Sequence, residues 1–107
     1  MEKTINLNFE KIEELTKLDK KTLVERALKL SEEVGEVSEA ILSYCNVCGC
    51  GYKKKGREDV IEECLDVIIV ASSLISHVSD GNLDNNFIRN LYLKKINKWE
   101  EKSKKSL

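Results

Sequence analysis

Apolar positions recur every three or four residues along much of this chain, which is the periodicity of helices with one buried side. The first such stretch covers residues 8–18 and predicts a short amphipathic helix. The second begins at Thr22, where Glu25 three residues on completes a capping box, and it fades near Tyr44. Its predicted apolar stripe consists of Leu23, Ala27, Leu30, Val34, Val37 and Ile41.

The third predicted helix, from about Glu58 to Val78, is apolar nearly all round. Between Cys64 and Ser79 its only charged side chain is that of Asp66. Such a helix is typical of the centre of a helical assembly, because it needs neighbours on every side. Three other helices of this size do not supply enough surface, so the sequence predicts a homo-oligomer.

Turn-forming residues separate the predicted helices. Residues 45–57 hold three of the five glycines and a basic run, which predicts a loop. Gly81 is the expected C-cap of the third helix. A fourth helix is expected from about Asn86 to Lys102, followed by frayed residues 103–107.

Composition supports an all-α fold and narrows the range of partners. The chain has no proline, 35% charged residues and a net charge of −1, so no overall field favours nucleic acid or an anionic membrane. No apolar run is long enough to span a bilayer, and no signal peptide is recognisable. Without an export signal, the four cysteines are expected to be reduced thiols. We therefore expect one cytoplasmic domain, residues 1–107 with a core at about 22–100, that binds neither nucleic acid nor membrane.

Two pairs of acids at i, i+3 spacing carry the candidate chemistry. Glu33 and Glu36 share a flank of the second helix, and Glu63 and Asp66 share a face of the third. A carboxylate in so apolar a segment as that of Asp66 needs a positive partner. Antiparallel packing would bring both pairs together as an oxygen-rich cage suited to Mg²⁺ or Mn²⁺. Metal ions held by such a negative cage can bridge the oxygens of an anionic substrate and activate water, which favours phosphate chemistry. Alternatively, Glu33 and Glu36 would equally suit ion pairs with lysine or arginine on the surface.

The segment Glu32-Glu33-Val34-Gly35-Glu36, followed by Glu63-Cys64-Leu65-Asp66, resembles the EExxE…ExxD signature of the MazG-like all-α nucleoside triphosphate pyrophosphohydrolases. The resemblance covers about residues 22–100. It implies a four-helix bundle assembled as a homodimer or homotetramer, which cleaves a nucleoside triphosphate to a monophosphate and pyrophosphate, often to clean the nucleotide pool. The Mg²⁺ ligands that it implies are Glu33, Glu36, Glu63 and Asp66, with Glu32 behind them. Glu36 is the first candidate to deprotonate the attacking water.

Candidate substrate contacts lie outside the acid motifs. The resemblance places a lysine and an asparagine in a comparable late helix, where this chain has Lys94, Asn97 and Lys98 on one flank. Lys53 belongs to a basic run that could close over phosphates, although charge runs often only solubilise a loop. Trp99 could stack on a base or belong to the core or an interface. His77, the single histidine, is expected to be a core residue without a catalytic role.

The cysteines leave a second metal hypothesis open. Cys45, Cys48 and Cys50 in one loop, with Cys64 nearby in sequence, are compatible with zinc. Cys64, however, is expected on the apolar side of its helix as a small core residue. The alternatives to a pyrophosphohydrolase are therefore a non-catalytic helical metal-binding or interaction module and a small zinc-binding regulator. A phosphoribosyl-nucleotide substrate also remains open.

Overall fold

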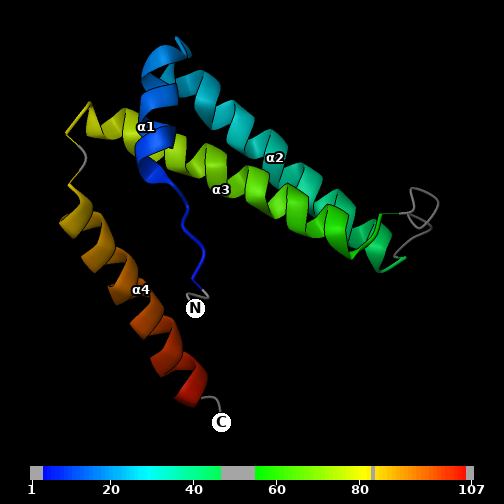
Figure 1. Ribbon diagram of the computed structural model, residues 1–107. Helices are drawn as coiled ribbons and strands as arrows, with labels where there is room; N and C mark the ends of the chain where they lie inside the picture. The colour runs from blue at the N-terminus through cyan, green and yellow to red at the C-terminus, as the bar shows by residue number, and fades with distance from the viewer. Residues whose placement is uncertain (1–3, 47–54, 83, 106–107) are drawn as a thin grey trace.

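The computed structural model describes residues 4–46, 55–82 and 84–105, and the regular structure in these ranges is entirely helical. The helices, shown in Figure 1, are α1 (Phe9–Leu18), α2 (Leu23–Tyr44), α3 (Arg57–Ser79) and α4 (Asn85–Lys105). The all-α prediction is confirmed. In the described ranges, no helix combines the length and apolar character needed to cross a membrane.

Local side-chain chemistry fixes the helix ends. The predicted capping box of α2 is present, since Thr22 Oγ1 accepts from the Glu25 backbone N–H and Glu25 Oε1 accepts from the Thr22 backbone N–H. At the end of α3 the C-cap is Asp80, in the left-handed conformation with φ 49°, and not Gly81. Aspartate tolerates this conformation better than most residues, and Gly81 continues it with φ 79°.

The predicted fraying after Lys102 is wrong for residues 103–105, which are helical. Residues 106–107 lie outside the described residues. Basic side chains in the last turn of α4 suit the negative end of the helix dipole, and they help this turn to stay helical.

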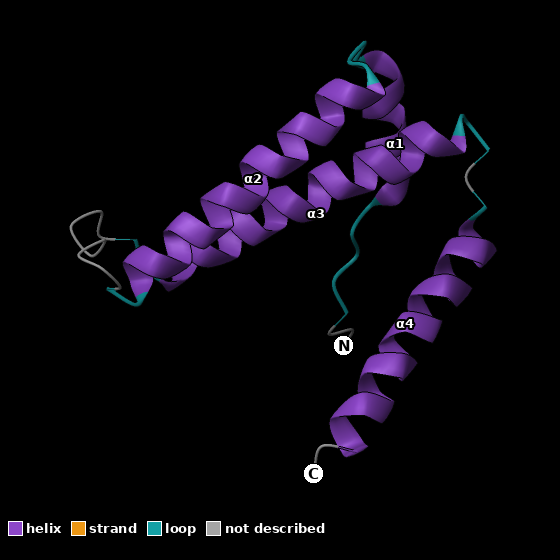
Figure 2. Ribbon diagram, turned by 180° about the vertical axis from the view of Figure 1, so that it is seen from behind, coloured by secondary structure: helices purple, strands orange, loops and turns teal. Residues whose placement is uncertain are grey.

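Helices α2 and α3 form a long antiparallel hairpin, and α1 packs across α3 near the start of α2 (Figure 1). Helix α4 leaves the end of α3 and stands away from the hairpin in both views (Figure 2). In the described part of the chain, α4 packs against none of the other three helices. The single chain is therefore a three-helix unit with an outlying fourth helix.

Most of the fully buried residues of the hairpin are polar. Ala40 is the one buried apolar residue in the described ranges, and its buried companions are Arg26, Glu33, Ser43, Ser72 and Ser76. The predicted apolar stripe of α2 is instead largely open: Val34 is 48% and Ile41 is 42% exposed. The prediction was wrong about the buried face: residues 26, 33 and 40, seven apart on one face of α2, are buried instead, as are Ser72 and Ser76 of α3.

Candidate metal centre

Three glutamates from two helices converge midway along the hairpin. Glu33 and Glu36 come from α2 and Glu63 comes from α3, and each offers one carboxylate oxygen within 4.8 Å of the others. The i, i+3 spacing places the first two on one flank of α2, and antiparallel packing brings α3 alongside. Asp66, the fourth predicted ligand, is half-buried one turn beyond Glu63 and lies outside this group of three.

Two oxygens of this acid cluster (Glu33, Glu36 and Glu63) are buried and lack hydrogen-bond partners. They are Glu33 Oε2 and Glu63 Oε2, one from each helix. Glu33 as a residue is only 7% exposed, so it is not a surface group, although its Oε1 does form an ion pair with a lysine, as the alternative expected. Leaving a buried polar atom unpaired costs about 1–3 kcal/mol. A divalent cation between α2 and α3 would satisfy both atoms, and this all-oxygen set fits Mg²⁺ or Mn²⁺.

Crowding of acids changes the protonation of Glu63. Desolvation raises the pKa of its carboxyl, and the hydrogen bond with Glu36 and the negative charges of Glu36, Asp66 and Glu33 raise it further. Protonation of Glu63 would thus relieve the same repulsion that a bound cation would relieve. Although Asp66 is outside the group of three, its charge belongs to the same electrostatic centre.

Lys29 is a neighbour of the cluster that the sequence interpretation missed. Its Nζ lies 3.1 Å from Glu33 Oε1 and 3.3 Å from Glu32 Oε1. The hydrogen bond to Glu33, followed by the one to Glu32, raises the pKa of Lys29, so its amine stays charged. The signal was available, since lysine and glutamate four residues apart on a helix are neighbours.

The predicted substrate contacts lie apart from the acids. Lys94, Asn97 and Lys98 do line one hollow, but it is on α4, which does not pack against α2 or α3 in the described residues. Trp99, also on α4, is 73% exposed, so within one chain it is not a core residue. Lys53 lies outside the described residues.

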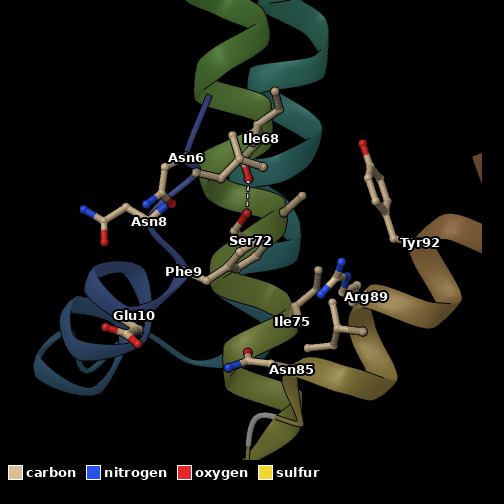
Figure 3. A pocket seen from close by; sticks show the side chains of 13 residues that line it. Asn6, Asn8, Phe9, Glu10, Ile68, Ser72, Ile75, Asn85, Arg89 and Tyr92 are labelled. Carbon is tan, nitrogen blue, oxygen red and sulfur yellow. Dashed lines mark hydrogen bonds between the residues drawn. The ribbon is translucent and has the colours of Figure 1, made fainter. Parts of the chain in front are cut away.

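A larger cavity of about 730 Å³ lies between α3, α4 and the N-terminal segment. Figure 3 shows Ile68, Ser72 and Ile75 of α3 facing it, with Arg89 and Tyr92 across from them on α4. The Ser72 hydroxyl turns back to donate to the Ile68 carbonyl oxygen at 2.7 Å, so it offers this cavity no free donor. None of the clustered acids lines this space.

The cysteines that can be placed do not form a site. Cys45 and Cys64 are both exposed free thiols, so the prediction that Cys64 is a core residue was wrong. It lies on a part of α3 that is open to solvent in the single chain. Cys48 and Cys50 lie outside the described residues, and the zinc hypothesis stays a hypothesis.

The comparisons with known proteins add no relative from which a function could be transferred. No protein-family model, curated protein or solved structure matches the chain.

Proposed function

We propose that this chain is a Mg²⁺-dependent, MazG-like nucleoside triphosphate pyrophosphohydrolase, which cleaves its substrate to a nucleoside monophosphate and pyrophosphate. The observation that carries the proposal is the pair of buried, unpartnered carboxylate oxygens of Glu33 and Glu63 within the acid cluster. Their placement on two helices matches the two halves of the motif that the sequence resembles. Glu33, Glu36, Glu63 and Asp66 would hold the metal, with Mn²⁺ as a substitute for Mg²⁺.

The proposed reaction follows from what such acids can do. The metal, when bound, supplies charge stabilisation at the phosphate oxygens and lowers the pKa of water. Glu36 is exposed whereas Glu33 is buried, so Glu36 is the acid that bulk water reaches and the candidate general base. The water oxygen joins a phosphorus of the α–β anhydride, Glu36 takes its proton, and the bridging oxygen leaves with the other phosphate.

A homo-oligomer, dimer or tetramer, is part of the proposal for two reasons. The apolar stripe of α2 and much of α3 are open to solvent in one chain, which is a large apolar surface for a protein of this size. The predicted substrate contacts Lys94 and Lys98 also stand away from the acids of their own chain. A second copy packed on the hairpin would cover the first feature, and its α4 would bring cations to the acids.

The test is pyrophosphate release by the full chain from a panel of canonical and modified nucleoside triphosphates, with a phosphoribosyl nucleotide included. With Mg²⁺ we expect monophosphate and pyrophosphate from at least one of them. Glu33→Gln and Asp66→Asn should each lower turnover by at least about 100-fold, since they remove ligands. Glu62→Gln, an exposed acid on the same helix, is the matched control and should retain wild-type turnover.

The remaining outcomes separate the alternatives. A folded chain that binds Mg²⁺ yet releases nothing from any substrate supports the non-catalytic metal-binding module. Turnover that survives Asp66→Asn but not Glu33→Gln removes Asp66 from the ligand set. Turnover unaffected by either change contradicts the metal centre.

A further inference from the structure

Among the described residues, the acid cluster has one close cation, Lys29, and its position raises a problem for metal binding. Lys29 Nζ contacts Glu33 Oε1 at 3.1 Å, while the other oxygen of the same carboxylate has no partner. A divalent cation held by Glu33 would therefore sit beside an ammonium group. Like charges this close repel, so a bound metal weakens the hold of Glu33 on the lysine ammonium and favours its departure.

Lys29 also lines a small cavity, which none of the clustered acids lines. It has a volume of about 220 Å³ between α1, α2 and α3, and the cations lining it are Lys21, Arg26 and Lys29. Its acid is Asp19. Its charged side chains carry three positive charges and one negative charge, an excess that favours an anion near Lys29, although Ile12, Leu15, Ile69 and Val70 also line it.

Of these three cations, two have partners that are not proposed metal ligands. Arg26 donates to the backbone oxygens of Thr16 and Asp19 and to His77, and Lys21 pairs with Asp19 at 3.7 Å. Lys29 is the one whose buried partner, Glu33, is also a proposed metal ligand. Its side chain is 43% exposed, so it has room to turn.

We propose that Lys29 is an exchangeable cation of this centre: its ammonium holds Glu33 in the metal-free protein and binds a phosphate oxygen of the substrate once a divalent cation has taken Glu33. This inference rests on the proposed function and adds a residue to it. Lys29 thereby stabilises the empty cage and later neutralises charge on the anhydride, in both cases as a point charge on a flexible stem.

The experiment measures two affinities on the full chain. The first is the affinity for Mn²⁺ without nucleotide, which is measured from the electron paramagnetic resonance signal of free Mn²⁺. The second is the affinity for inorganic pyrophosphate at saturating Mg²⁺, which is measured by calorimetry. In Lys29→Met we expect Mn²⁺ to bind on the order of 3- to 10-fold more tightly, because a repelling charge is gone, and pyrophosphate to bind more weakly by a similar factor.

Two variants serve as controls. Lys29→Arg keeps the charge and should remain near wild type in both affinities. Lys11→Met removes a lysine that pairs with Glu14 at 3.3 Å on the exposed side of α1, and it should change neither. Circular dichroism checks that each variant is helical, and Lys29→Gln replaces Lys29→Met if the latter loses helicity.

The outcomes distinguish the two proposals. If wild type binds no Mn²⁺, the metal centre fails and the lysine exchange fails with it. If wild type binds Mn²⁺ and Lys29→Met binds it no more tightly, the exchange is overturned and the proposed function stands. If pyrophosphate affinity is unchanged in Lys29→Met, the part of the proposal in which Lys29 binds a phosphate oxygen is overturned. The ammonium would then stay paired with Glu32 in the loaded protein.

Discussion

The Nε–H of Arg26 donates a hydrogen bond of 2.9 Å to Nδ1 of His77, and it joins the beginning of α2 to the last turn of α3. The same guanidinium donates through Nη2 to the backbone oxygens of Thr16 and Asp19, each at 3.2 Å. Arg26 is 5% exposed. One buried side chain therefore ties the end of α1, the start of α2 and the end of α3 together.

Arg26→Met should destabilise the chain by about 2–4 kcal/mol, because it removes three hydrogen bonds from a charged donor and leaves buried acceptors unpaired. The free energy of unfolding is measured in urea by circular dichroism at one fixed protein concentration. His77→Phe removes one of these acceptors and should cost less. Equal stability of Arg26→Met and wild type would show that the hydrogen bonds of Arg26 do not contribute to the free energy of unfolding.

The raised pKa of Glu63 makes the stability of the metal-free protein depend on pH. The unfolded chain loses this proton near the ordinary value of 4.5, whereas the folded chain keeps it to higher pH. Between these two values the folded state binds more protons, so its stability falls as pH rises from about 4.5 through the folded pKa. In chelator, the thermal midpoint of Glu63→Gln should therefore fall less steeply between pH 4.5 and 7 than that of wild type.

Glu62→Gln is the matched control for this pH series, because Glu62 is exposed beside Glu63 and should keep the wild-type slope. Saturating Mg²⁺ should reduce the slope in wild type, since the metal binds the deprotonated ligands. A parallel pH dependence in wild type and Glu63→Gln would mean that Glu63 is not its source.

Ile41→Lys tests whether the open stripe of α2 is an interface. In an isolated chain this side chain is 42% exposed, and such a surface change alters stability by less than about 0.5 kcal/mol. In the proposed oligomer the lysine would be buried against a second copy, so sedimentation should show dissociation to monomers. Ser38→Lys, at an exposed polar position of α2, should leave the assembly intact. Identical sedimentation of both variants and wild type would contradict an interface at Ile41.

Local chemistry made the helices predictable from the sequence, whereas the buried faces depended on long-range packing. The capping box at Thr22 and the turn at Asp80 and Gly81 are short-range features, so the helix ends could be located closely. The convergence of Glu33, Glu36 and Glu63 followed from spacing and antiparallel packing. Periodicity alone gave the wrong buried face of α2, because it assumes an apolar interior, and this hairpin buries Arg26 and Glu33 instead.

The placement of α4 could not be predicted for the same reason. Its sequence is helical by composition, but its position depends on surfaces that other elements offer. In the described residues it finds none within its own chain. The distance of Lys94 and Lys98 from the acids is therefore a property of the single chain that no helical pattern reveals.

A newly made chain leaves much apolar surface open, since Ala40 is its one fully buried apolar residue in the described ranges, so by itself it gains less free energy from apolar burial than a domain with a closed core. In the assembly that we propose, most of that gain comes when two chains meet. The folded fraction then depends on the concentration of the protein, and dilution unfolds it as a denaturant would. The proposed enzyme would switch on steeply with the amount that a cell makes, without any separate regulator.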